Sequence, residues 1–278
     1  MTTPDVPRLS AHGAEIPAIG FGTSGLGDKA GEMVAAALKL GYRHVDTAWK
    51  YGTERGVGEG IRASGVPRGE IFLTTKVSHE YLQPADFERS TEESLQTIGV
   101  DYVDLLLVHW PNPEIPVEQP IGALAKMKRR GLARHIGVAN FNIALLDEAI
   151  RLSPEPLVTL QAECHPYLDQ AKVLQACRER GLVLTAYCPL GRGRLISDPV
   201  VGEIARAKGK SVAQIALRWL IQQGNVAPIP RSSNPKRIAE NLDVFGFALT
   251  DDEMKRISAL KRPDGRIANP VGRAPAWD

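Results

Sequence analysis

The sequence has few cysteines, few aromatic residues and almost no excess of charge of either sign. Of its 278 residues, 3 are cysteine and 6% are aromatic, and 34 basic residues stand against 32 acidic ones. A net charge of +2 provides no basic surface of the kind that binds nucleic acid. Because Cys164, Cys177 and Cys188 show no paired spacing, we interpret them as reduced packing residues and expect no metal site.

The sequence also lacks an apolar run of the roughly 18 residues that a membrane span requires. Its first residues, 1–5, do not show the basic and then apolar pattern of a secretion signal. We therefore expect a cytoplasmic protein that acts without a membrane or nucleic-acid partner.

Short β-branched runs alternate with amphipathic stretches along the whole chain, which predicts strands that each lead into a helix. The stretch Pro84 to Ile98 is the clearest helix, because its apolar residues share one face and Gly99 ends it. The eight predicted strands begin near Ala18, Arg43, Ile71, Tyr102, Arg134, Val158, Leu182 and Val226.

Eight alternating strands and helices predict a parallel sheet that closes into a barrel, a fold that takes roughly 250 residues. We therefore expect an α/β protein with one domain, residues 1–278, folded as a single (β/α)8 TIM barrel. Residues 9–17 predict an N-terminal β-hairpin that plugs the barrel bottom. The long interval before Val226 predicts extra helices around 199–208 and 211–222, and the tail from Lys261 is expected to be irregular, with room to fold over the mouth.

One glycine pattern supports a different fold. Gly20, Gly22 and Gly25 spell G-x-G-x-x-G, and Asp46 follows 21 residues after Gly25, as in the dinucleotide fingerprint of a doubly wound sheet. The preceding strand is short and contains Pro17, which is unusual in a central parallel strand. We therefore keep the doubly wound fold only as the alternative.

Three successive predicted strands end in polar residues that can take part in catalysis: Asp46, Lys76 and His109. Parallel strands bring their carboxyl ends to one face of a barrel, so these side chains are expected to lie close together. Taken one at a time, each residue also has an ordinary interpretation: Asp46 as a helix cap, Lys76 as a solvated lysine and His109 as a core histidine.

The chain carries a series of motifs that resembles the aldo-keto reductase family, in order and over almost its whole length. These motifs are 41–48 (GYRHVDTA), 51–54 (YGTE), 74–76 (TTK), 107–111 (LVHWP), 137–141 (GVANF), 161–167 (QAECHPY), 186–191 (AYCPLG) and 229–232 (IPRS). The short loops and the ending at 275–278 are most similar to the bacterial 2,5-diketo-D-gluconic acid reductases, a branch also associated with methylglyoxal. The resemblance implies NADPH-dependent reduction of small aldehydes, ketones or dicarbonyls by a protein that we expect to be monomeric.

The resemblance implies a catalytic tetrad of Asp46, Tyr51, Lys76 and His109. Reduction of a carbonyl needs a hydride, which the nicotinamide supplies, and a proton donor, for which we predict Tyr51. A free tyrosine has a pKa near 10, and we expect the ammonium of Lys76 to lower the pKa of Tyr51. Asp46 would keep Lys76 protonated, and His109 would orient the carbonyl oxygen. Taken alone, Tyr51 could instead be a loop aromatic that covers the barrel rim.

The resemblance also assigns residues to NADPH and to the substrate. Asn140 and Gln161 would bind the carboxamide, Tyr187 would stack on the nicotinamide, and an arginine–serine cluster would hold the 2′-phosphate. The predicted cofactor residues are Gly22, Thr23, Asp46, Asn140, Gln161, Tyr187, Leu190, Arg192, Arg231, Ser232, Arg237, Glu240 and Asn241. The predicted substrate residues are Trp49, His109 and Trp110.

The sequence departs from the family pattern at three positions. Ala139 replaces a serine beside the carboxamide-binding Asn140, Arg231 replaces a lysine, and Ser24 stands where an aromatic is common. Because Ala139 removes a hydroxyl from the nicotinamide site, we expect weaker binding of the nicotinamide but no loss of activity. The alternative function is a non-catalytic NADPH-binding barrel, since fold alone does not prove turnover.

Overall fold

The computed structural model describes residues 6–278. Residues 1–5, where the sequence predicts no secretion signal, lie outside the described residues. The chain begins with the antiparallel hairpin of β1 (Arg8–Ala11) and β2 (Ala14–Pro17), as the sequence predicts. His12 and Gly13 form its two-residue turn with φ of 46° and 87°, the left-handed pair that suits the twist of a tight hairpin.

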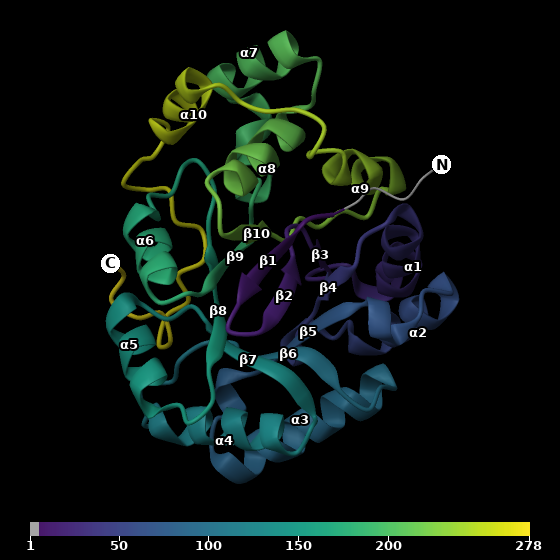
Figure 1. Ribbon diagram of the computed structural model, residues 1–278, viewed down its shortest axis with the longest axis vertical. Helices are drawn as coiled ribbons and strands as arrows, with labels where there is room; N and C mark the ends of the chain where they lie inside the picture. The colour runs from purple at the N-terminus through teal and green to yellow at the C-terminus, as the bar shows by residue number, and fades with distance from the viewer. Residues whose placement is uncertain (1–5) are drawn as a thin grey trace.

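Eight parallel strands follow, each beginning within about three residues of its predicted start (Figure 1). They are paired in sequence order, so each strand lies beside the next one along the chain. The strands are β3 (Phe21–Gly22), β4 (His44–Asp46), β5 (Phe72–Val77), β6 (Val103–Val108), β7 (Ala133–Ala139), β8 (Leu157–Glu163), β9 (Val183–Tyr187) and β10 (Val226–Pro228).

Main-chain hydrogen bonds join the first strand of this sheet to the last and close the barrel. Gly20 N donates to Pro228 O at 2.9 Å, and Gly22 N donates to Pro230 O at 3.0 Å. A Cβ at Gly22 would lie 2.9 Å from the main-chain oxygen of Ile229, so this close approach requires glycine. Gly20 and Gly22 of the G-x-G-x-x-G pattern therefore serve barrel closure, and the doubly wound alternative is wrong.

Helices surround the sheet (Figure 1). Helix α3 has the predicted bounds and buries the predicted face, including Phe87, Leu95 and Ile98. The helices are α1 (Ala30–Leu40), α2 (Glu54–Ser64), α3 (Pro84–Ile98), α4 (Glu118–Arg129), α5 (Ile143–Leu152), α6 (Ala171–Glu179), α7 (Pro199–Lys208), α8 (Val212–Gln222), α9 (Pro235–Leu242) and α10 (Asp251–Ser258). The long interval after β9 holds α7 and α8, as predicted.

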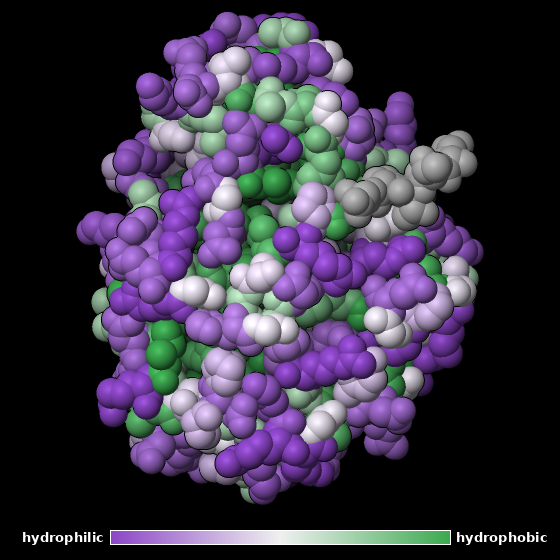
Figure 2. Space-filling view, in the orientation of Figure 1, coloured by the Kyte–Doolittle hydropathy of each residue, from purple (hydrophilic) through white to green (hydrophobic). Residues whose placement is uncertain are grey.

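The hairpin covers the end of the barrel where the strands begin. Ala14 and Ile16 are fully buried in one cluster with Phe72 and Val183, the first residues of β5 and β9. In Figure 1 the hairpin lies across the centre of the view, and the same view in Figure 2 shows hydrophobic and hydrophilic residues intermixed at this centre. Because the hairpin seals this end, the carboxyl ends of the strands form the open mouth.

The tail after α10 has no helix or strand over residues 261–278, as expected, and Asp278 at its end contacts the start of α5. Within residues 6–278, none of the helices combines the length and apolar composition needed to cross a membrane.

Candidate active site

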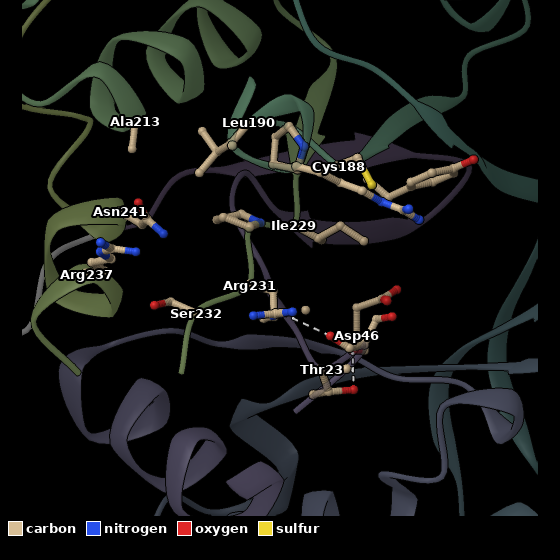
Figure 3. Close-up of a pocket in the computed structure, with 18 of the residues that line it drawn as sticks. Thr23, Asp46, Cys188, Leu190, Ala213, Ile229, Arg231, Ser232, Arg237 and Asn241 are labelled. Carbon is tan, nitrogen blue, oxygen red and sulfur yellow. Dashed lines mark hydrogen bonds between the residues drawn. The ribbon is translucent and has the colours of Figure 1, made fainter. Parts of the chain in front are cut away.

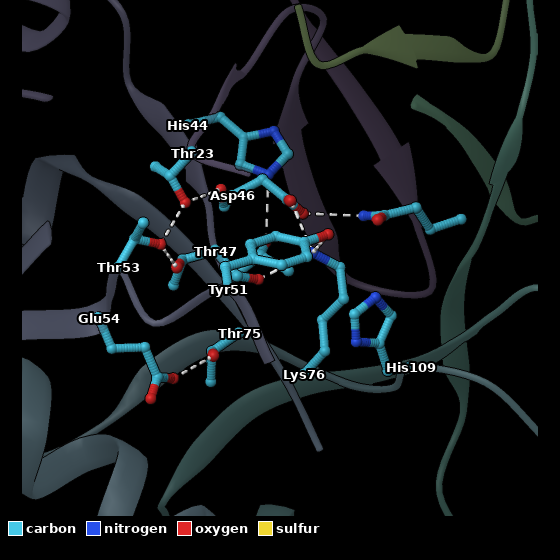
Figure 4. A network of polar contacts seen from close by, with 12 residues as sticks. Thr23, His44, Asp46, Thr47, Tyr51, Thr53, Glu54, Thr75, Lys76 and His109 are labelled. Atoms are coloured by element: carbon cyan, nitrogen blue, oxygen red, sulfur yellow. Dashed lines mark hydrogen bonds and ion pairs between the residues drawn. The ribbon is translucent and has the colours of Figure 1, made fainter. Parts of the chain in front are cut away.

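Lys76 lies at the centre of the polar network at the mouth, and all three of its ammonium hydrogens can be accounted for (Figure 4). Its Nζ donates to Asp46 Oδ1 at 2.6 Å, to Thr47 O at 2.8 Å and to Tyr51 Oη at 3.4 Å. Asp46 ends β4, Lys76 lies near the end of β5, and Tyr51 ends the short 3-10 helix η2 (Trp49–Tyr51) after β4. The barrel therefore brings together three residues that the sequence predicts to act together.

The ordinary interpretations of Asp46 and Lys76 are wrong. Lys76 is fully buried and Asp46 is 1% exposed, so the lysine is not a solvated one. The carboxylate of Asp46 accepts from Lys76 through Oδ1 and from Gln161 Nε2 through Oδ2 at 2.8 Å, and it caps no helix. A buried ion pair is costly to desolvate, and full hydrogen bonding of both partners offsets that cost. The pair is thus held in one geometry before any substrate arrives.

The expectation that Lys76 lowers the pKa of Tyr51 is wrong. Burial and the nearby charge of Asp46 raise the pKa of Tyr51 well above its usual value. Burial also lowers the pKa of Lys76, against the opposing effect of Asp46. The physical reason is that burial penalises the charged phenolate most, and the negative charge of Asp46 adds to that penalty. Tyr51 therefore holds its proton firmly, as a donor must before the reaction begins.

His109 follows β6 and faces Tyr51 across the mouth, with the two ring centroids 5.5 Å apart and nearly perpendicular. It lines the cavity, so it is not the enclosed core histidine of the ordinary interpretation. Burial, and next the charge of Lys76, hold the pKa of His109 well below its usual value. The imidazole is therefore neutral at pH 7 and can donate one ring N–H to an oxygen in the cavity.

Asn140, Gln161 and Tyr187 form a linked group beside Asp46 and His109. Asn140 follows β7, Gln161 lies in β8 and Tyr187 ends β9. Tyr187 Oη donates to Asn140 Oδ1 at 2.7 Å, and Asn140 Nδ2 donates to the main-chain oxygen of His109 at 2.8 Å. Gln161 is tied to Asp46, as described above. Each amide keeps unused donor or acceptor positions, because an amide group can make about four hydrogen bonds. Asn140, Gln161 and Tyr187 all line the cavity, so they can hold a flat ring that carries an amide.

The cavity has a volume of about 980 Å³ and extends from His109 and Trp110 to the loops after β9 and β10. At that far end Arg231, Ser232 and Arg237 approach the cavity with Asn241 of α9 (Figure 3). Arg231 Nε donates to Ser24 O at 3.1 Å, which leaves the other guanidinium N–H groups for a ligand. This donor set fits a phosphate group.

Every residue predicted to bind the cofactor lines this one cavity. They are Gly22, Thr23, Asp46, Asn140, Gln161, Tyr187, Leu190, Arg192, Arg231, Ser232, Arg237, Glu240 and Asn241. The side chains of Asn140, Gln161 and Tyr187 lie at one end and those of Arg231, Ser232 and Arg237 at the other, which is the order that a nicotinamide dinucleotide with a 2′-phosphate needs. The residues present therefore fit NADPH.

Of the three predicted substrate residues, two line the cavity and one does not. Trp110 lines the cavity beside His109, whereas Trp49 is not among the lining residues and its ring packs edge-on against Tyr81 at 4.8 Å. Ala139 is fully buried in the barrel interior, one residue before Asn140, and Ser24 is exposed at the cavity edge.

The sequence reasoning missed two parts of the cavity. Ser211, Val212 and Ala213 bring the N-terminus of α8 to the wall, and Ala268 reaches it from the tail. The helix start was detectable, because barrels of this kind commonly bind phosphate at the loops after their seventh and eighth strands and at a nearby helix N-terminus. The tail from Lys261 was expected to have room to fold over the mouth, but no sequence signal singled out Ala268. Among residues 6–278 no three His, Cys, Asp or Glu side chains cluster as a metal site would require.

Comparisons with known proteins agree with this geometry. Residues 18–262 match the model of the aldo/keto reductase family. The chain is 40% identical over 267 residues to the methylglyoxal reductase DkgB of Escherichia coli O157:H7, covering 95% of this chain and 99% of that protein. A solved structure provisionally described as a 2,5-diketo-D-gluconic acid reductase B superposes with a TM-score of 0.95 at 47% identity and 98% coverage of both chains. The NADP complex of a Bombyx mori aldo-keto reductase gives a TM-score of 0.90 at 32% identity, with 96% coverage of both chains.

Proposed function

The chain belongs to the aldo/keto reductase family, and we propose that it reduces small aldehydes, ketones or dicarbonyls to alcohols with Tyr51 as the proton donor. Family membership makes it an oxidoreductase for NADPH-dependent carbonyl reduction. We further assign it to the oxidoreductases that act on CH–OH groups with NADP as the acceptor.

In this proposal His109 and Tyr51 act on the same oxygen atom. The neutral imidazole of His109 donates a hydrogen bond that orients the substrate carbonyl in the mouth. When bound, the nicotinamide supplies the hydride that the carbonyl carbon accepts. The Tyr51 hydroxyl gives its proton to the carbonyl oxygen, and its electron pair stays on the phenol oxygen.

Lys76 and Asp46 act through Tyr51 in this proposal. The ammonium of Lys76 lies 3.4 Å from the phenol oxygen, where it stabilises the negative charge that appears as the proton leaves. Asp46 holds that ammonium in place through its 2.6 Å contact. This contact set of Lys76 is the observation that carries the proposal, because it places a buried cation against the Tyr51 phenol, whose ring faces His109.

The remaining cavity residues would hold the cofactor. Asn140 and Gln161 have amide positions left for the carboxamide, and Tyr187, which lines the same space, would stack its ring on the nicotinamide. Arg231, Ser232 and Arg237 would bind the 2′-phosphate through charge-assisted hydrogen bonds. That contact would favour NADPH over NADH, which has no phosphate at this position.

The relatives indicate the substrate class. DkgB of Escherichia coli is a methylglyoxal reductase, and a relative in Bacillus subtilis is a glyoxal reductase. We propose small dicarbonyls of this kind, or 2,5-diketo-D-gluconate, as substrates. We also propose that the chain acts as a monomer of one domain, residues 1–278, in the cytoplasm.

The proposal is tested by mixing the protein with NADPH and a panel that includes methylglyoxal, glyoxal and 2,5-diketo-D-gluconate. We expect the nicotinamide absorbance to fall with at least one of them, and to fall more slowly with NADH. Tight NADPH binding with no absorbance change across the panel would favour a non-catalytic binding barrel instead.

A further inference from the structure

The C-terminal strap, residues 262–278, starts from a fixed point beside the barrel. Arg262 N donates to Tyr167 O at 3.1 Å, and the Arg262 guanidinium lies 3.6 Å from the centre of the Tyr167 ring. Gly265 then packs directly on the main chain of Tyr167, where a Cβ would overlap the carbonyl oxygen. Only glycine allows this approach, so Gly265 sets where the strap turns toward the mouth.

Glu163 holds the next part of the strap. It is the last residue of β8 and is fully buried. Its Oε1 accepts from Ile267 N at 2.8 Å, and its Oε2 accepts from Ala268 N at 2.7 Å. His165 Nε2 contacts Oε1 at 2.8 Å. Ala268 itself lines the cavity, so this carboxylate fixes the position of a wall residue.

The mechanism described above gives Glu163 no role, yet a buried carboxylate is costly. Burial alone would raise the pKa of Glu163, but the hydrogen bonds from His165 and from the main chain of Ala268 and Ile267 outweigh it and lower that pKa. The carboxylate is therefore ionised near neutral pH and depends on the strap for two of its hydrogen bonds. Burying a carboxylate costs free energy, and this one is bonded by two main-chain N–H groups of the strap. This arrangement indicates that Glu163 holds the strap in place.

Beyond Ala268 the strap contacts loops at the carbonyl end of the cavity. Arg273 Nη1 lies 3.2 Å from His79 Nδ1, after β5. The Trp277 ring lies 6.2 Å from that of Trp110, after β6. The Asp278 carboxylate accepts from Ile143 N at 3.0 Å, at the start of α5 after β7. The arginine cluster for the phosphate follows β10, at the other end of the cavity.

From this path we infer that Glu163 is a positioning residue: it latches the C-terminal strap over the carbonyl end of the mouth and thereby sets the affinity for the carbonyl substrate. The latch acts through Ala268 and through the placement of Trp277 against Trp110. The expected effect on the KM for the carbonyl substrate rests on the proposed carbonyl reduction, whereas the attachment of the strap to Glu163 does not.

The barrel side of the latch is tested with Glu163→Gln, which keeps the side-chain volume. The amide has one oxygen acceptor, and its NH2 group cannot accept from the second main-chain N–H. We expect the KM for the carbonyl substrate to rise roughly tenfold, as for the loss of one hydrogen bond to a charged group. The kcat and the Kd for NADPH should stay within about twofold, because the tetrad and the phosphate end are untouched.

The strap side of the latch is tested with Gly265→Ala. This variant substitutes none of the residues that line the cavity, and its added Cβ displaces the strap from Tyr167. Gly246→Ala is the matched control, since a Cβ at Gly246 has no atom within 4 Å. We expect Gly265→Ala to reproduce the KM change of Glu163→Gln, and Gly246→Ala to leave every parameter at the wild-type value.

Amide hydrogen exchange provides a readout that needs no activity. In both latch variants we expect the peptide containing 266–270 to exchange at least about tenfold faster, with the amides of β8 and β9 unchanged. Unchanged exchange of this peptide in both variants would overturn the inference, as would a weaker Kd for NADPH with an unaltered carbonyl KM. If Glu163→Gln does not fold, Gly265→Ala alone decides. A wild-type protein that reduces no carbonyl would defeat the proposed function and still leave the exchange result to judge the latch.

Discussion

The two ends of the cavity differ in how their polar groups are satisfied. At the tetrad end, Asp46 and Lys76 are buried and bonded to each other and to neighbouring protein groups. At the phosphate end, Arg231 and Arg237 are exposed and approach the cavity from loops and a helix N-terminus. Preorganised charge in a dry site can stabilise a transition state, whereas exposed guanidinium groups contribute mainly to binding. We therefore expect changes at the first end to reduce the rate and changes at the second to reduce affinity.

The largest effect should come from Lys76→Met, which leaves the buried Asp46 carboxylate without its cation. Removing one partner of a buried ion pair costs about 3–5 kcal/mol of unfolding free energy. We also expect kcat to fall by at least about 10³-fold, because the support for the Tyr51 oxygen is lost. Denaturant unfolding and NADPH oxidation measure the two effects.

A double variant separates stability from chemistry in that experiment. Asp46→Leu combined with Lys76→Met removes both charges, so most of the lost unfolding free energy should return while the activity does not. Recovery of activity in the double variant would show that Lys76 serves only the fold, and it would remove the contrast between the two ends.

A smaller effect is expected from Arg237→Ala at the phosphate end. Loss of charge-assisted hydrogen bonds worth about 1.5–3 kcal/mol should weaken NADPH binding roughly 10- to 100-fold. The Kd for NADH and the kcat at saturating NADPH should change little. Arg89→Ala, on the exposed face of α3, is the control. Fluorescence titration measures both Kd values, and equal losses for NADPH and NADH would place the 2′-phosphate elsewhere.

The smallest effect should be that of pH. Burial, followed by the charge of Asp46, raises the pKa of Tyr51, so the donor stays protonated through neutral pH. Burial and then the charge of Lys76 lower the pKa of His109, so the imidazole stays neutral through its usual titration range and below it. Between about pH 6.5 and pH 8 neither group changes state, and kcat/KM should vary less than about twofold. A bell-shaped profile centred near pH 7 would contradict these directions.

The same contrast explains how much could be predicted from the sequence. Strand ends follow from local pattern, so Asp46, Lys76 and His109 were predictable as neighbours once the strands were counted. Helix α3 was also predictable from local pattern, because its apolar residues share one face and Gly99 ends it. The sign of the pKa shift of Tyr51 was not predictable, because it depends on how deeply the phenol is buried and on how close the charge of Asp46 lies to it.

Contacts between distant segments were also beyond sequence reasoning. Glu163 bonds main-chain N–H groups 104 and 105 residues away, and main-chain donors carry no residue signature. The need for glycine at Gly265 exists only where the strap meets Tyr167. Trp49 was predicted as a substrate residue, yet its ring packs on Tyr81 and it is not among the residues that line the cavity.

The central claim is that Tyr51, held against Lys76, gives the proton for carbonyl reduction. The most direct test is a single turnover of the Tyr51→Phe variant, preloaded with NADPH and mixed with the best carbonyl substrate of the wild-type protein. We expect the rate of NADPH oxidation to fall by roughly 10²–10⁴-fold while the Kd for NADPH stays within about twofold. A Tyr51→Phe variant that folds and oxidises NADPH at the wild-type rate would contradict it.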